Sequence, residues 1–248
     1  FGDEDSYVLS NNILNSDLKY FCRSLIEEER EVLEKNIFKS KKDVNKKVIV
    51  VFSENYKNIA SFLKNKYPEE EYFMIMPEDF DTQIKEILNV DLSIENYNDL
   101  SKFDTSLKIS HSPRIRDDIG SIYYITDYDV GKTIVPIFRS YALNMDTFSS
   151  SEIFHDANDI KKLVDFENTY IPITKKMIEN ISKKQDPLIK SEIENSLIRD
   201  FLIIEKVFQN NLFRENLLPI SGNKKIKRSG CIDRNLNLWK VSTADFTY

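Results

Sequence analysis

The chain has 248 residues, of which 41% are hydrophobic and 31% are charged, and its formal net charge is -6. This length and apolar content suit one large or two small domains with a packed core. The acidic balance excludes a general attraction to nucleic acid or to anionic membranes, so any such contact must come from a local basic patch. No apolar run approaches the ~18 residues that a membrane-spanning helix needs, so the sequence predicts no membrane partner.

Cysteine usage and the first residues indicate a cellular compartment. The two cysteines, Cys22 and Cys231, lie near opposite ends of the chain, which is not the spacing of a zinc site. The opening "FGDEDSYVLS" is acidic and lacks the basic start of a secretory signal. Together these features predict a cytoplasmic or otherwise intracellular protein.

The first third of the chain predicts a strand–helix–strand unit. Apolar residues recur at helical spacing from about residue 16 to residue 38. "VIVVF" at 48–52 is a short β-branched run, which is typical of a strand buried on both faces. Ile59, Phe62 and Leu63 follow at helical spacing, and "YFMIM" at 72–76 predicts the next strand. This order indicates parallel pairing of the two strands.

Further elements follow along the chain. A helix is predicted around 79–88, a strand in "SLKIS" at 106–110, and a third buried strand at 122–125. Helical patterns dominate later, and the longest runs over 187–213 with a broad apolar stripe. "CIDRNLNLWKV" at 231–241 has the pattern of a hairpin.

These elements predict an α/β fold, with a partly parallel Rossmann-like sheet core, an N-terminal helix and a mostly helical C-terminal region. The predicted division is an N-terminal helical segment at 1–45, an α/β core at 46–148, and a helical region with a basic loop and a hairpin at 149–248. The polar stretch "MDTFSSSE" is the candidate boundary. The helix over 187–213 is a candidate interface for homo- or hetero-oligomers.

The segment "SIYYITDYDVGKTIV" at 121–135 carries the most chemistry. Asp127 and Asp129 directly follow the third predicted strand, and ligands of parallel sheets bind at the carboxyl ends of strands. Two carboxylates that converge there repel each other, and a divalent cation relieves the repulsion. The pair therefore predicts a site for Mg²⁺ or Mn²⁺, which prefer oxygen ligands.

The same segment resembles the Toprim domain of topoisomerases, primases and OLD-type nucleases. In that family a strand ends in Thr/Val-Asp-x-Asp and a glycine follows, as Thr126, Asp127, Asp129 and Gly131 do here. The family also carries a glutamate after its first strand, which Glu54 matches. The resemblance implies Glu54 as general acid/base, the two aspartates as Mg²⁺ ligands, and a nuclease that hydrolyses or transfers phosphodiesters of nucleic acid.

The match departs from the family pattern at three positions: Asn55 replaces a glycine, Asn58 replaces an aspartate, and Gly131 comes one residue earlier than the family's glycine. Basic residues near the segment and in the loop "GNKKIKRSG" are the candidates for binding phosphate or nucleic acid. These candidates are Lys132, Arg114, Arg116, Lys224, Lys225, Lys227 and Arg228.

Other interpretations of 121–135 stay open. "TDYDVGKT" matches a phosphate-binding P-loop apart from its first glycine, where Thr126 stands. The two aspartates also suit a metal-dependent glycosyltransferase that uses a nucleotide sugar. The segment is alternatively a solvated turn with Gly131 at positive φ. The broad apolar stripe of the helix over 187–213 also leaves open a non-catalytic structural or assembly subunit. Whether the chain is an enzyme stays undecided by sequence.

Overall fold

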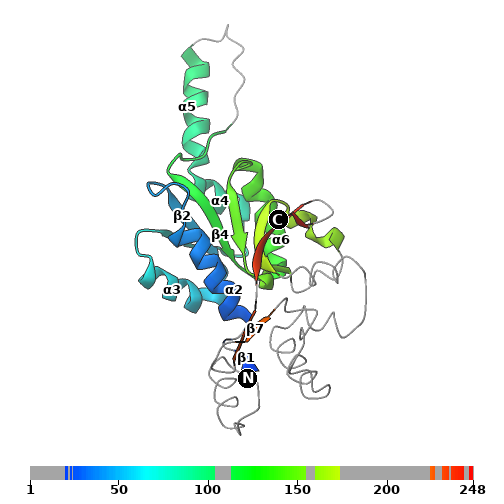
Figure 1. Ribbon diagram of the computed structural model, residues 1–248. Coiled ribbons are helices and arrows are strands. Elements are labelled where there is room, and N and C mark those ends of the chain that lie inside the picture. Colours follow the sequence, from blue (N-terminus) through cyan, green and yellow to red (C-terminus); the bar gives the residue numbers. More distant parts are fainter. Residues whose placement is uncertain are drawn as a thin grey trace.

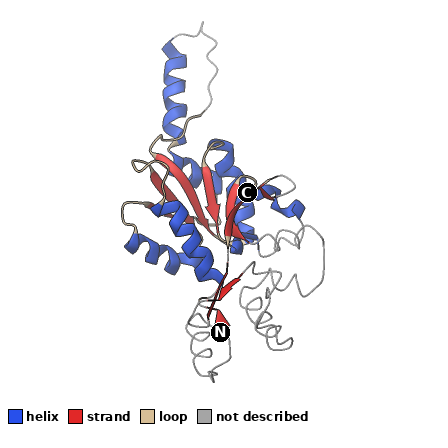
Figure 2. Ribbon diagram, in the orientation of Figure 1, coloured by secondary structure: helices blue, strands red, loops and turns tan. Residues whose placement is uncertain are grey.

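The computed structural model describes residues 20–21, 23, 25–103, 113–154, 160–173, 224–226, 231–234, 236–242 and 246–247. Within these residues a twisted sheet lies between two layers of helices, as Figures 1 and 2 show. The predicted α/β class with a partly parallel, Rossmann-like sheet is confirmed. The predicted strand at 106–110 and the long helix at 187–213 lie outside the described residues.

The main sheet has seven strands in the order β10-β9-β6-β5-β4-β2-β3. Its five parallel strands are β2 (Lys47–Phe52), β3 (Glu71–Met74), β4 (Ile119–Ile125), β5 (Asp146–Ser149) and β6 (Thr169–Ile173). Two strands, β9 (Asn237–Val241) and β10 (Phe246–Thr247), extend the sheet in antiparallel orientation. The parallel pairing predicted for the first two strands is confirmed, with Val50 opposite Tyr72.

One face of the sheet is covered by α2 (Leu25–Glu34), which continues into the π-helical turn η1 (Lys35–Lys39), and by α3 (Lys57–Lys66). Leu33 and Leu63 are buried against this face together with Val50 of the central strand. Burial of such side chains contributes about 1.5–3 kcal/mol each. Phe62 shares the apolar spacing of α3 but is 61% exposed, because it lies on the side turned away from the sheet.

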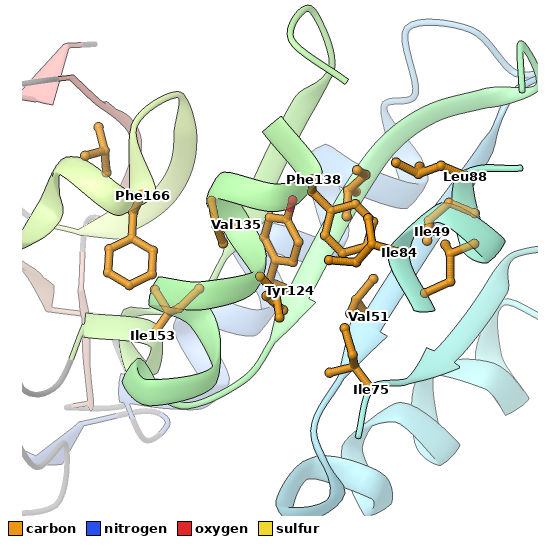
Figure 3. Packing of buried hydrophobic residues seen from close by; sticks show 14 of the residues in the cluster. Ile49, Val51, Ile75, Ile84, Leu88, Tyr124, Val135, Phe138, Ile153 and Phe166 are labelled. Carbon is orange, nitrogen blue, oxygen red and sulfur yellow. The ribbon is translucent and has the colours of Figure 1, made fainter. Parts of the chain in front are cut away.

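The opposite face is covered by α4 (Phe80–Leu88), α6 (Tyr128–Tyr141) and the 3₁₀ turns η3 (Ser151–Phe154) and η4 (Ile160–Phe166). Figure 3 shows Phe138 of α6 and Ile84 of α4 meeting Tyr124 of the sheet. The Phe138 and Tyr124 rings lie 5.6 Å apart at a tilted angle, which is a favourable aromatic geometry. After α4, the helix α5 (Val90–Phe103) projects away from the sheet (Figure 1).

A second sheet of three strands has the order β1-β8-β7, with β1 at Tyr20–Phe21, β8 at Cys231–Arg234 and β7 at Lys224–Ile226. Residues 20–21 therefore form a strand where the sequence predicted a helix, because they pair with β8. The predicted hairpin at 231–241 is also wrong. Its two strands belong to different sheets, since β8 pairs with β7 and β9 pairs with β6.

The main sheet continues through the predicted boundary at residue 148. Strand β5 spans that position, and both β6 and β9 extend the same sheet beyond it. The division into three segments itself stays a prediction. Among the helices in the described part of the chain, none has the length and apolar character to cross a membrane.

Candidate functional site

The strand order places a topological switch point between β2 and β4. From β2 the chain passes through α3 to β3 on one side, whereas from β4 it passes through α6 to β5 on the other side. In open α/β sheets, ligands bind in the crevice outside the carboxyl ends of the strands at such a point. The residues that follow Phe52 and Ile125 are therefore a candidate binding site.

A buried hydroxyl residue directly follows each of these two strands. Ser53 is 6% exposed and Thr126 is 1% exposed. The backbone N–H of Ser53 donates to the carbonyl of Ile125 at 3.2 Å, which extends the ladder between the two strands and brings their ends together. Ser53 is also the N-cap of the 3₁₀ turn η2 (Glu54–Tyr56), but its side chain does not cap the turn.

Among the residues that the structure describes, Ser53 Oγ and Thr126 Oγ1 have no hydrogen-bond partner. A buried polar atom without a partner costs about 1–3 kcal/mol, so such atoms are rare in folded proteins and call for a physical explanation. A third atom of this kind, the Tyr124 hydroxyl oxygen, lies in the core beside Phe138. The first two are distinctive because they lie at adjacent strand ends of the switch point.

The end of β5 adds three consecutive serines, which are all buried. Ser149 Oγ donates to the carbonyl of Tyr124 at 3.0 Å, and Ser150 Oγ donates to Glu152 Oε2 at 2.8 Å. Ser151 donates from its backbone N–H and its hydroxyl to the fully buried carboxylate of Glu29 on α2, at 3.1 and 2.8 Å. These bonds fix α2 and β5 to one another at the carboxyl edge of the sheet.

Charged groups surround the hydroxyl residues. Arg30 on α2 lies 3.8 Å from Glu152, and both side chains are largely buried. Burial raises the pKa of the Tyr56 hydroxyl, and the nearby carboxylates of Glu152 and Asp127 raise this pKa further. Tyr56, Glu152, Asp127 and Arg30 therefore share one electrostatic environment at the carboxyl edge.

We call this group the switch-point cluster and define it as Ser53, Tyr56, Thr126, Asp127, Ser150, Glu152 and Arg30. Sequence reasoning found only Asp127 of these residues. The sequence feature that could have identified Ser53 and Thr126 is the position of a hydroxyl residue directly after the apolar runs of β2 and β4. The serines after β5 were assigned to a domain boundary instead.

The structure places the two aspartates differently from one another. Asp127 is the N-cap of α6, and its Oδ1 accepts a hydrogen bond from the Val130 N–H at 3.0 Å. Asp129 is exposed and forms an ion pair with Lys132 at 2.5 Å, one turn along the helix. Glu54 lies in the exposed turn η2 at the end of β2. In the described part of the chain, no group of three or more His, Cys, Asp or Glu residues is arranged to hold a metal ion.

The roles assigned to Glu54, Asp127 and Asp129 stay predictions, and so does Mg²⁺. Lys132 has its ammonium occupied by Asp129 and lies 5.1 Å from the centre of the Tyr128 ring. Its role in binding phosphate is a prediction as well.

The structure brings the other basic candidates to different places. Arg116 precedes β4 and binds Glu71 with two hydrogen bonds of 2.8 Å, so it lies at the amino edge of the sheet, opposite the aspartates. The exposed Arg114 lies in the same approach to β4, and its backbone N–H donates to Ser93 Oγ. Lys224 and Lys225 lie in β7 of the second sheet. Lys227 and Arg228 are outside the described residues.

The GKT segment is a helix and not a phosphate-binding loop. Helix α6 begins at Tyr128, so residues 131–133 are already helical and their N–H groups do not form a concave cradle. Gly131 has no positive φ, in contrast to the turn interpretation. Its lack of a side chain serves packing, because a Cβ there would lie 2.5 Å from Ile153 Cγ1 and 3.1 Å from the Phe166 ring.

No family model matches the sequence, and no curated protein matches it either. Among solved structures, the C-terminal domain of LpoA from Haemophilus influenzae, described as a regulator of PBP1A, matches with 8% identity and a TM-score of 0.46. This chain is covered to 89% in that match and spans 66% of the LpoA domain.

Two ABC transporter proteins also match, each over 89% of this chain. One is a putative branched-chain amino acid ABC transporter protein from Rhodospirillum rubrum, with 12% identity, a TM-score of 0.47 and 65% of its length covered. The other is an ABC transporter solute-binding protein from R. palustris in complex with benzoate, with 10% identity, a TM-score of 0.46 and 61% covered. At these scores, no ligand or partner of these proteins is transferred to this chain.

Several sequence-based predictions are corrected by these findings. The relationship to Toprim enzymes is wrong, since the matching structures are LpoA and solute-binding proteins and the Asp-x-Asp segment starts a capped helix. The Mg²⁺-dependent nuclease function, the glycosyltransferase alternative and the nucleic-acid partner are withdrawn for the same reason. The predicted cytoplasmic location is likewise corrected, since the structures that match are a regulator of PBP1A and proteins of ABC transporters.

Proposed function

We propose that this chain is a non-catalytic recognition domain that binds a small polar molecule at the switch-point cluster. The observation that carries the proposal is the pair of buried, unpartnered hydroxyl oxygens of Ser53 and Thr126 at adjacent strand ends. A bound molecule that forms hydrogen bonds with these oxygens removes the free-energy penalty of leaving them unpaired, and this gain contributes to its affinity and specificity. Because both oxygens are buried, the molecule must displace the groups that cover them.

The same hydroxyls argue for binding rather than catalysis. A serine or threonine nucleophile requires a general base within hydrogen-bond reach that removes its proton. Among the described residues, Ser53 Oγ and Thr126 Oγ1 have no hydrogen-bond partner that could act as this base.

The charges around the cluster indicate the chemistry of the ligand. Asp127 and Glu152 are anionic and Arg30 is the cation that lies beside Glu152. A molecule with hydrogen-bond donors, such as an ammonium or several hydroxyl groups, therefore finds acceptors here. The hydroxyls of Ser53 and Thr126 both donate and accept, so they also accommodate a carbonyl or carboxylate of the same molecule.

A thermal-shift screen with free amino acids, small amines and monosaccharides tests the proposal. A ligand at 100 times its Kd stabilises the folded state by about 2.7 kcal/mol, which is readily detected. Thr126→Val preserves the shape of the side chain and removes only the hydroxyl, so it is expected to weaken the binding of a hit.

The matched control is Thr147→Val. Thr147 is also buried, but it lies at the start of β5, and its Oγ1 is bonded to the Asn168 carbonyl and to Thr169. This variant is expected to bind the hit as the wild type does. The proposal fails if no class of compound stabilises the protein, or if Thr126→Val and Thr147→Val bind the hit equally well.

A further inference from the structure

A cavity lies at the opposite, amino edge of the same sheet. Its volume is about 550 Å³, which falls within the usual range for sites that hold small molecules. The cavity is lined by the first residues of β2, β4 and β5, including Lys47, Ser121 and Asp146, and by the segment 40–46 that leads into β2. The switch-point cluster is at the carboxyl ends of these strands, so the two sites are separate.

Four lysines line this cavity, namely Lys41, Lys42, Lys46 and Lys47, against two aspartates, Asp43 and Asp146. Two of the lysines are held by carboxylates at the start of β3, because Lys41 pairs with the buried Glu70 and Lys47 pairs with Glu71 at 2.6 Å. These two ammonium groups are already compensated. The charge available to a ligand therefore comes from the other two lysines.

Lys42 and Lys46 are the available cations. Lys42 pairs with Asp146 at 2.5 Å, but its side chain is 84% exposed, and exposed pairs of this kind contribute only about 0–1 kcal/mol. A ligand anion therefore replaces Asp146 as the partner of Lys42 at little cost. Lys46 is exposed, and no carboxylate of the described residues lies within ion-pair distance of its ammonium.

The backbone around Lys46 is held close to β4 by Gly120. A Cβ at position 120 would lie 2.9 Å from Lys46 Cβ, so only glycine permits this approach. The Lys47 N–H donates to the Asp118 carbonyl at 2.7 Å and fixes the same segment against the start of β4. The lysine-bearing segment is thus positioned by backbone contacts at the mouth of the cavity.

The other wall of the cavity is apolar and aromatic. The rings of Phe148 and Tyr170 stack with their centres 5.4 Å apart and their planes at 25°, and Leu238 lies beside them. This wall offers a surface for a flat or branched apolar group. The cavity therefore combines two available cations with an apolar wall.

We propose that this amino-edge cavity binds a small organic anion, with its carboxylate or phosphate group at Lys42 and Lys46 and its apolar body against Phe148 and Tyr170. Asp146 competes with the ligand for Lys42. The cavity shares no residue with the switch-point cluster, so this proposal is independent of the proposed function.

Isothermal titration of the full chain with phenyl phosphate and phenylacetate tests this proposal, with inorganic phosphate and benzyl alcohol as probes that lack one of the two features. At least one of the two organic anions is expected to bind about tenfold more tightly than both comparison probes. Binding of phenyl phosphate alone identifies a phosphate head group, and binding of phenylacetate alone identifies a carboxylate. The affinity is expected to fall as salt is added.

Substitutions give opposite expected effects. Lys46→Gln and Lys42→Gln are expected to weaken binding about five- to tenfold, whereas Asp146→Asn is expected to strengthen it by removing the competing carboxylate. Lys102→Gln, which changes an exposed lysine of α5 paired with Asp99, is the control and is expected to leave binding unchanged. The proposal is overturned if neither organic anion binds, if inorganic phosphate or benzyl alcohol binds as tightly, or if Asp146→Asn weakens binding as the lysine variants do.

Discussion

The carboxyl edge and the amino edge of the sheet satisfy their polar groups in different ways. At the amino edge, Arg116 binds both Glu71 and Asp118, and Glu70 accepts from the Val48 N–H while pairing with Lys41. At the carboxyl edge, the hydroxyls of Ser53 and Thr126 have no hydrogen-bond partner in the described part of the chain. Charge compensation at the amino edge stabilises the fold, whereas the unpartnered hydroxyls oppose stability, and a bound molecule can compensate them.

The largest expected effect is at the carboxyl edge, where Glu29 joins α2 to the end of β5. Glu29→Ala leaves the Ser151 N–H and hydroxyl buried without an acceptor, so it is expected to lower the free energy of unfolding by about 3 kcal/mol. Urea unfolding followed by circular dichroism measures the change. Glu31→Ala on the same helix removes a carboxylate that pairs with Arg23 in an exposed position, and it is expected to cost under about 1 kcal/mol. Equal losses would contradict the assigned role of Glu29.

At the amino edge, Arg116→Gln is expected to cost about 2 kcal/mol at neutral pH. The hydrogen bonds from Arg116 hold the pKa values of Glu71 and Asp118 below their ordinary values of 4.5 and 3.8. The stabilisation is therefore fully present above the pKa values of the unfolded chain. It is lost as the pH falls through the lowered pKa values of the folded state.

The difference in stability between wild type and Arg116→Gln is thus expected to shrink in acid, and urea unfolding at pH 7 and at about pH 3 measures it. A difference that stays constant across this range would show that Arg116 acts through packing alone.

A smaller effect is expected where α6 begins. Asp127→Ala removes the N-cap of α6 and is expected to cost about 1 kcal/mol. Asp129→Ala removes only a pair with Lys132 along the exposed helix surface, and about 0.3 kcal/mol is expected. Thermal unfolding of both variants measures the two costs. If Asp129→Ala lowers the stability as much as Asp127→Ala does, the N-cap hydrogen bond of Asp127 does not contribute the expected stabilisation.

Thermal unfolding of the wild type, Asp127→Ala and Asp129→Ala with and without Mg²⁺ tests the predicted metal site. A rise in the Tm of the wild type with Mg²⁺ that disappears in both variants would support metal binding by the two aspartates. A Tm that does not respond to Mg²⁺ would remove that prediction.

Much of the central sheet was predictable because its strands are short apolar runs. The runs that became β2 and β4 are buried on both faces, so their composition alone distinguishes them from surface elements. Parallel pairing then fixed which ends meet, which is why Glu54 and Asp127 follow adjacent strands. The same rule places Arg116 at the amino edge, since it precedes β4, although the sequence interpretation grouped it with the aspartates.

The remaining features depend on contacts between distant residues. Strand β8 pairs with β1, which is some 210 residues earlier in the chain, and no local pattern near residue 231 indicates this. The lack of partners for Ser53 and Thr126 within the described ranges is also a tertiary property, because each residue type normally finds a partner nearby. Gly131 carries the signal of a turn in sequence, but close packing of Ile153 explains it.

The most direct test of the carboxyl-edge account is the stability of two matched variants measured by urea unfolding without ligand. Thr126→Val removes an unpartnered hydroxyl, so it is predicted to leave the free energy of unfolding unchanged or to raise it by up to about 1 kcal/mol. Thr147→Val removes a bonded hydroxyl of the amino edge and is predicted to lower it by about 1 kcal/mol. A loss in Thr126→Val as large as that in Thr147→Val would show that the Thr126 hydroxyl is already bonded in the folded protein and would contradict the account.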